Sequence, residues 1–451
     1  MTFGMSKLHD ACRDAGCVPR HNEGKRLEDE LALVTSLLET EDLEQKDDFN
    51  RTPLIWACYL PNFYQSYDFT RKIKEEIVLL LIQKGADVNA NAEGWTPLGL
   101  SVHRNSPASV KELVARGANL ESKGEKGQTP LMSACGGETT MGPANTEIAR
   151  LLVQSGAEVN VCCVNGRTPL MYACESGLYD LVELLIAAGA DIHAVSTERE
   201  PVTVFGAACR GASVNGYKYE DVEGCRYDIP KKILEAGADV LTRSHGHPPI
   251  YTVLNSGGSE NAQKELVQAL IQKGADLMEP GHEGQTGLEA LVFKFPKVAK
   301  QVMQEKGLDL NQPTNGTLPL HHAVTVYVPE AIPKFLDLGA SITAVDGKGM
   351  TALHHAATCF KPDNTELLLD RGADVNACDN QGQTPLIVAI IYGREQQIEL
   401  LMERGADKNV RDKEGKTAGD YARERAQNDA QQAANLKLIG ESGVFEKCVI
   451  A

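Results

Sequence analysis

A three-residue pattern close to Thr-Pro-Leu returns along almost the whole chain. Its copies begin at residues 52, 96, 129, 168, 203, 248, 286, 318, 351, 384 and 417. Successive copies lie 32 to 45 residues apart, and four of the ten intervals equal 33 residues. A period of this length is typical of repeat proteins, in which each short unit buries its apolar face against its neighbours. The chain is therefore expected to form a solenoid.

Each repeat carries the signals of two helices. At Thr168, the threonine can cap a helix and the following proline fits the first helical turn. We expect a first helix over residues 170–175 and a second over 178–187, because leucines fall on one face of the second segment. Gly189 then supplies a left-handed C-terminal cap. A Gly-Ala-Asp-like motif of this kind occurs in ten copies, each followed by a polar turn or hairpin.

These motifs resemble those of the ankyrin-repeat family over roughly residues 5 to 430. The resemblance implies an all-α repeat solenoid of stacked helix-turn-helix units with short β-hairpin fingers, and a non-catalytic function in binding other macromolecules. We expect a degenerate capping repeat at 5–49, about ten ankyrin repeats at 50–414, a C-terminal capping unit at 415–432 and a flexible tail at 433–451.

Departures from the 33-residue period indicate insertions near 59–73, 136–145, 211–229 and 255–263. Two of these segments concentrate the aromatic residues of a chain that has few of them. Because protein interfaces favour aromatic side chains, they are candidates for partner binding. An equally weighted alternative is that the rings cover a widened gap between helices. The candidates are Tyr59, Phe63, Tyr64, Tyr67, Phe69, Tyr217, Tyr219 and Tyr227.

A second candidate surface follows from the resemblance, since the family binds through hairpin tips and the exposed side of the first helix. Matching residues here are Trp95, Arg167, Tyr172 and Tyr251. Trp95 is the strongest of them, because it follows Gly94 at a position expected to be exposed.

The charge balance limits the class of partner. With 45 Lys and Arg against 62 Asp and Glu, the net charge is −17, which argues against a nucleic-acid partner and favours basic or neutral proteins. The longest aliphatic run has six residues, too few to span a bilayer, and the N-terminus lacks a signal-peptide pattern. We expect a cytoplasmic monomer that binds one or more proteins.

No catalytic motif, cofactor site or metal site is indicated. Cys12, Cys58, Cys135, Cys174 and Cys209 share one repeat position and are expected to be reduced core residues. In the pairs His321-His322 and His354-His355, the first histidine is expected to make a hydrogen bond at the helix start. An enzyme that uses Cys225 with His245 or His247 is the least favoured alternative.

The last four residues are Cys448-Val449-Ile450-Ala451, a pattern recognised by protein prenyltransferases. Farnesylation of Cys448 would give reversible membrane association, because a single lipid binds a bilayer only marginally. The main hypothesis is an interaction scaffold or adaptor. The alternative is an effector or regulator that inhibits or sequesters a host or cellular protein, from either a eukaryote or a bacterium that delivers it into a host.

Overall fold

The computed structural model describes residues 6–14, 23–59, 68–124, 126–136, 146–214, 227–256, 259–314, 316–326 and 329–428. The chain divides into two compact units, residues 1–275 and 276–451, called here the N-terminal and C-terminal units. Within the described residues, no helix combines the length and the apolar character that crossing a membrane requires.

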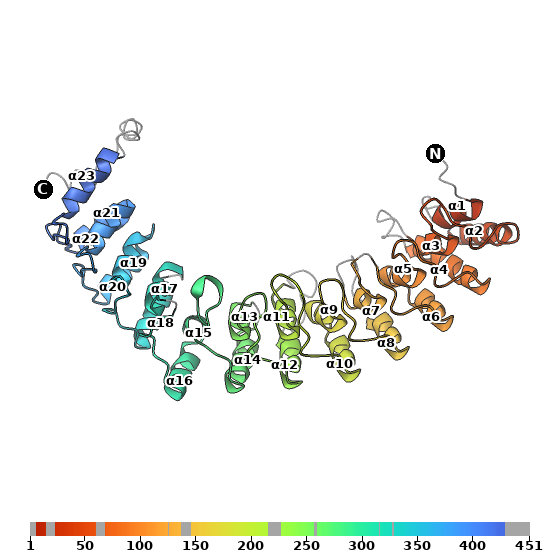
Figure 1. Ribbon diagram of the computed structural model, residues 1–451, viewed down its shortest axis with the longest axis horizontal. Helices are drawn as coiled ribbons and strands as arrows, with labels where there is room; N and C mark the ends of the chain where they lie inside the picture. Colours follow the sequence, from red (N-terminus) through yellow and green to blue (C-terminus); the bar gives the residue numbers. More distant parts are fainter. Residues whose placement is uncertain are drawn as a thin grey trace. The chain divides into compact units, whose positions relative to one another are not determined.

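In the N-terminal unit, helices follow one another in pairs, and the first and second helices of the pairs form two rows (Figure 1). The first helices are α1 (Lys7–Asp14), α3 (Pro53–Cys58), α5 (Pro97–His103), α7 (Pro130–Ala134), α9 (Pro169–Glu175), α11 (Val204–Val214) and α13 (Pro249–Asn255). The second helices are α2 (Glu23–Leu37), α4 (Asp68–Gln83), α6 (Pro107–Ala115), α8 (Thr146–Gln154), α10 (Tyr179–Ala187), α12 (Asp228–Glu235) and α14 (Glu260–Gln272).

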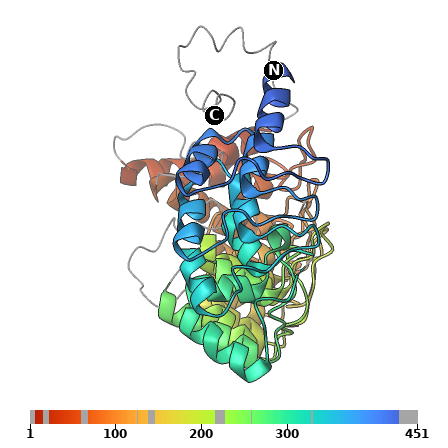
Figure 2. The same ribbon diagram turned by 90° about the vertical axis from the view of Figure 1, so that its left-hand side faces the viewer.

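The C-terminal unit repeats this arrangement, and its connecting loops run along one side of the helices (Figure 2). Its first helices are α15 (Gly287–Lys294), α17 (Pro319–Val326), α19 (Ala352–Thr358), α21 (Pro385–Tyr392) and α23 (Ala418–Asn428). Its second helices are α16 (Pro296–Lys306), α18 (Ala331–Asp337), α20 (Asp363–Asp370) and α22 (Glu395–Glu403), and a 3-10 turn, η3 (His282–Gly284), precedes α15.

The pair α9 and α10 shows why these sequences form such units. The Thr168 hydroxyl accepts a hydrogen bond from the Met171 amide at 3.4 Å, which caps α9. Leu181 and Leu185 of α10 are fully buried, and each such side chain contributes about 2 kcal/mol. Gly189 has a φ of +85°, so the Ala190 amide can turn back to the Leu185 carbonyl at 2.9 Å. The predicted helix pair is confirmed.

The hairpin fingers are short. In the N-terminal unit, single antiparallel bridges join Ala92 to Trp95 and Ser244 to His247. In the C-terminal unit, Val345 pairs with Thr351 in the same way. The predicted all-α repeat solenoid with small hairpin fingers is therefore the fold observed.

Side chains of one repeat cap the first helix of the repeat before it. These first helices are short, so their last carbonyl groups have no partners within the helix. Arg394 Nε donates to the Thr358 carbonyl at 2.6 Å. Gln397 Nε2 donates to the carbonyl of Ala356 in the last turn of α19 at 3.1 Å, and to those of Cys359 and Lys361 just after the helix at 3.2 and 2.8 Å. These bonds couple neighbouring repeats in addition to apolar packing.

Lys74 of α4 caps α3, the first helix of its own repeat, and α1, that of the repeat before. Its side chain is almost completely buried, with 1% of its surface exposed. Its Nζ donates to the carbonyls of Arg13 and Tyr59, each at 3.0 Å, and of Trp56 at 3.4 Å. The ends of α1 and α3 are thus held by one ammonium group. The sequence contained a signal for this residue, because Lys74 falls on the same helical face as the buried Ile73 and Ile77.

Described parts of three of the predicted insertions are helical. Residues 68–73 begin α4, residues 211–214 end α11, and residues 260–263 begin α14. Extra residues at these places lengthen helices, because continuing an amphipathic helix buries more apolar surface than a loop of equal length. Residues 60–67, 137–145, 215–226 and 257–258 of the insertions lie outside the described residues.

The five cysteines at the shared repeat position are all buried and free. Burial raises the pKa of the Cys12 thiol to about 12, and the nearby Lys74 charge only partly opposes this. Their prediction as reduced core residues is confirmed.

Candidate protein-binding surface

A solvent-open groove in the N-terminal unit lies between two consecutive hairpins and the helices α5 and α7. The space in and directly above it is about 650 Å³, part of which is open solvent. We call it the aromatic groove and define it by the lining residues Trp95, Gly99, Leu100, His103, Lys126 and Gln128.

The shape of this groove follows from a few side chains. Leu100 is 3% exposed and gives an apolar floor, whereas Gly99 lacks a side chain and leaves space above α5. Trp95 is half-buried, so part of its ring faces solvent. An apolar floor beside an incompletely buried indole is suited to receiving a large side chain of another protein.

A tight turn fixes Trp95. Glu93 and Gly94 both have positive φ values, 51° and 88°, as in a type I′ hairpin turn. The amide of Trp95 donates to the Ala92 carbonyl at 2.9 Å, and the Ala92 amide donates to the Trp95 carbonyl at 3.1 Å. Two hydrogen bonds therefore fix the backbone of Trp95. Because this residue is already held in place, less conformational entropy is lost when a partner binds to it.

Aromatic rings continue from the groove toward the preceding repeat. Trp95 meets Tyr59 edge-on with ring centres 6.4 Å apart, and Tyr59 meets Trp56 in the same way at 5.6 Å. The Arg51 guanidinium lies 4.8 Å from the Trp56 ring centre and 5.8 Å from that of Tyr59. Contacts of this kind between cations and aromatic faces hold both partners in fixed positions.

Asp47 is buried and holds this aromatic cluster in place through hydrogen bonds. Its Oδ2 accepts a hydrogen bond from Trp56 Nε1 at 2.8 Å, and its Oδ1 accepts from the amides of Phe49 at 2.9 Å and Arg51 at 2.8 Å. Phe49 extends the apolar surface outward, with 47% of its area exposed.

The polar groups of the groove include a neutral imidazole. Burial lowers the pKa of His103, and the neighbouring Arg104 charge lowers it further. Its Nδ1 is buried and has no hydrogen-bond partner among the described residues.

The expected exposure of Arg167 and Tyr172 is wrong. Arg167 is only 8% exposed because it bridges Glu175 at 2.6 Å and Glu198 at 2.7 Å. Tyr172 is 4% exposed, and its hydroxyl receives a hydrogen bond from Gln128 at 3.1 Å. These residues join adjacent repeats, so they offer a partner little surface.

Tyr227 and Tyr251 are also buried, at 2% and 8% exposure. The Tyr227 hydroxyl lies 3.0 Å from Ser256 Oγ, and the Tyr251 ring packs against His247 with centres 5.3 Å apart. For Tyr227 the structure favours the alternative that insertion rings cover the core. The burial of Tyr251 corrects its expected exposure.

Several candidates fall where no side chain is described. Phe69 lies in α4, but its side chain is not among those that the structure describes. Outside the described residues are Phe63, Tyr64, Tyr67, Tyr217, Tyr219, Cys225 and Cys448. Partner binding by these aromatic residues, thiol chemistry at Cys225 and lipidation at Cys448 remain predictions.

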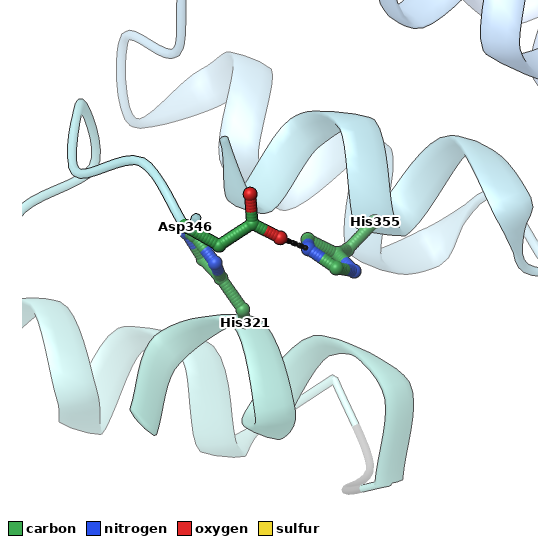
Figure 3. Close-up of side chains that lie close together, drawn as sticks. All are labelled: His321, Asp346 and His355. Atoms are coloured by element: carbon green, nitrogen blue, oxygen red, sulfur yellow. Dashed lines mark hydrogen bonds and ion pairs between the residues drawn. The ribbon is translucent and has the colours of Figure 1, made fainter. Parts of the chain in front are cut away.

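His354 makes the hydrogen bond expected at a helix start, with Nδ1 2.8 Å from the Thr351 hydroxyl. His321 instead approaches Asp346 and His355, which come from the next hairpin and from α19 (Figure 3). One potential ligand atom from each of the three lies within 4.8 Å of the others. They form the one such group identified among the described residues, and the sequence analysis missed it.

Comparison with known proteins agrees with the fold. The family model described as ankyrin repeats (3 copies) matches residues 26–124, 65–159, 104–196 and 320–412. The human ankyrin repeat and SOCS box protein 16 is 29% identical over 213 residues, 46% of this chain and 43% of that protein.

Two further relatives match shorter regions. Ankyrin repeat domain-containing protein 63 of Mus musculus is 36% identical over 96 residues, 21% of this chain and 24% of that protein. The ankyrin repeat, SAM and basic leucine zipper domain-containing protein 1 of Dasypus novemcinctus is 33% identical over 115 residues, 25% of this chain and 23% of that protein. The chain thus matches less than half the length of each of these three relatives.

Proposed function

Because the chain belongs to the ankyrin-repeat family, whose repeats are protein-protein interaction modules, we propose that it is a non-catalytic scaffold or adaptor. In this proposal, a partner protein binds to the aromatic groove and to the neighbouring rings of Tyr59 and Phe49. The observation that carries the proposal is the half-buried Trp95, fixed by a tight turn at the edge of a groove open to solvent.

The groove suggests what its partner must present. Leu100 and Trp95 favour an aromatic or branched aliphatic side chain, and the groove places the polar residues His103, Lys126 and Gln128 beside it. The chain's net charge of −17 favours a partner whose surrounding surface is basic or neutral. Inhibition or sequestration of a cellular protein would use the same contacts, so it differs from an adaptor role only in the consequence for the partner.

The relatives support the binding proposal only through their repeats. The SOCS box, SAM and basic leucine zipper named in two of them belong to proteins of which this chain matches 43% and 23%. The names of those proteins therefore do not identify a binding partner of this chain. The test is therefore made on this chain: proteins captured from cell extract by the parent are compared with those captured by Trp95→Ala. Equal capture of every partner by both would contradict the proposal.

Farnesylation of Cys448 remains a separate prediction from the sequence Cys448-Val449-Ile450-Ala451. In protein expressed in eukaryotic cells, Cys448 is expected to gain one farnesyl group, with removal of Val449-Ile450-Ala451 and methylation of the new terminal carboxyl. The intact mass should match this processed product, and the protein should associate reversibly with membranes. Cys448→Ser should abolish both effects. Intact mass and cell fractionation measure them, and an unmodified, fully soluble parent would disprove the prediction.

A further inference from the structure

Three histidines occupy the same position at the start of a first helix, and His321 differs from the other two in its hydrogen bonds. His9 Nδ1 lies 2.9 Å from the Ser6 hydroxyl, and His354 Nδ1 lies 2.8 Å from the Thr351 hydroxyl. The corresponding position before His321 is Leu318, which has no hydroxyl to offer. His321 is 1% exposed, and its Nδ1 has no hydrogen-bond partner among the described residues. A buried, unpaired ring nitrogen is costly and therefore calls for an explanation.

The other ring nitrogen of His321 determines what Nδ1 can do. Nε2 lies 3.1 Å from the Ala344 carbonyl, and because a carbonyl oxygen can only accept, Nε2 must carry the proton. Nδ1 therefore presents a lone pair. A histidine that donates one N–H to a backbone carbonyl while the other nitrogen faces a cation is the usual arrangement of a metal ligand.

Two further potential ligand groups lie near His321 (Figure 3). His355 Nε2 lies 3.0 Å from Asp346 Oδ2. The rings of His321 and His355 are stacked, with centres 4.9 Å apart. The amides of Lys348 and Met350 donate to Asp346 Oδ1 at 2.8 and 2.9 Å, so the carboxylate is held with Oδ2 directed at His355.

We propose that His321, Asp346 and His355 bind a divalent transition-metal ion, with Zn²⁺ as the best-matched ion. Two imidazoles and one carboxylate are typical zinc ligands, and water would complete a tetrahedral site. Ligand atoms of such a site lie ~3.3 Å apart, as follows from metal-ligand distances of about 2.0–2.2 Å. His355 Nε2 and Asp346 Oδ2 are already 3.0 Å apart, and one potential ligand atom of each residue lies within 4.8 Å of the others. Side-chain rotations that move His321 closer to this pair by up to about 1.5 Å would form the site.

Binding of the metal ion requires one change of tautomer, and no covalent bond other than N–H is broken. His355 Nε2 must offer its lone pair to the metal, so its proton moves to Nδ1, and Asp346 Oδ2 exchanges its bond to His355 for a bond to the ion. The His355 side chain is 23% exposed and that of Asp346 10%, which leaves a solvent side from which the ion can enter. A filled site would join α17 to the following hairpin and α19, and so stiffen this part of the C-terminal unit.

The test is calorimetric titration of the metal-stripped full chain with ZnCl₂, after accessible thiols have been blocked with iodoacetamide. The parent is expected to bind one equivalent. His355→Gln and Asp346→Asn should each weaken binding by about tenfold or more. His193→Gln is the matched control, because His193 is an exposed histidine of the N-terminal unit and should leave binding unchanged.

Circular dichroism of each variant shows whether it is folded. Asp346→Asn retains Oδ1 as the acceptor for the Lys348 and Met350 amides, so the hairpin should persist. The proposal is overturned if the folded parent binds no stoichiometric zinc. It is equally overturned if the parent, His355→Gln and Asp346→Asn bind with the same affinity.

Discussion

Replacing Lys74 with Met is expected to lower the free energy of unfolding of the N-terminal unit by about 3 kcal/mol. Met preserves most of the length and apolar contacts of the lysine stem but has no donor. Three hydrogen bonds to the carbonyls of Arg13, Trp56 and Tyr59 are lost together, and the Trp56 bond is fully buried. The loss is large because buried acceptors without partners retain their full cost of desolvation.

The effect should be concentrated at the N-terminal end, because stability in a repeat protein depends on neighbouring contacts. Amide hydrogen exchange is expected to accelerate first in α1 and α3, and chemical denaturation gives the total loss. Lys72→Met is the matched control, since Lys72 is an exposed lysine of the same helix. Equal denaturation midpoints for the two variants would show that Lys74 does not hold the helix ends.

Trp95→Ala is expected to weaken binding of the captured partner by about 2 kcal/mol, or ~30-fold. The ring forms a wall of the aromatic groove and meets Tyr59 edge-on at 6.4 Å, so its removal opens the groove and loosens a neighbouring contact. Tyr59→Ala should act on the same contact, and the effects of the two substitutions should therefore not add.

Titration calorimetry with the purified partner measures this loss, and circular dichroism shows that the variants are folded. Phe360→Ala is the control, because Phe360 is an aromatic residue of the C-terminal unit with 77% of its surface exposed. If Trp95→Ala and Phe360→Ala both bind within about twofold of the parent, the groove contributes too little to be a central contact of the interface.

The repeat fold could be predicted because its signals are local. The cap at Thr168 and the left-handed Gly189 each act within one unit, so a single repeat determines its own helix ends. Arg167 shows the limit of this reasoning. Its repeat position predicted exposure, but Glu198, 31 residues away in the next hairpin, pairs with it and covers it.

The candidate site could be predicted only in part, because some of its contacts join different repeats. Trp95 was identified from its place beside Gly94, whereas its contact with Tyr59 depends on how two repeats pack. His321, Asp346 and His355 are separated by 25 and 9 residues, a spacing unlike any local ligand motif. Only the stacking of α17, the following hairpin and α19 brings the three together.

Site-specific photocrosslinking tests the central claim most directly. In one variant, a photoreactive amino acid replaces Lys126, an exposed lysine at the aromatic groove. In the control variant it replaces Lys111, an exposed lysine on α6, which is a second helix. The purified partner should crosslink strongly from position 126 and weakly or not at all from position 111. Strong crosslinking from 111 with none from 126 would contradict binding at the aromatic groove.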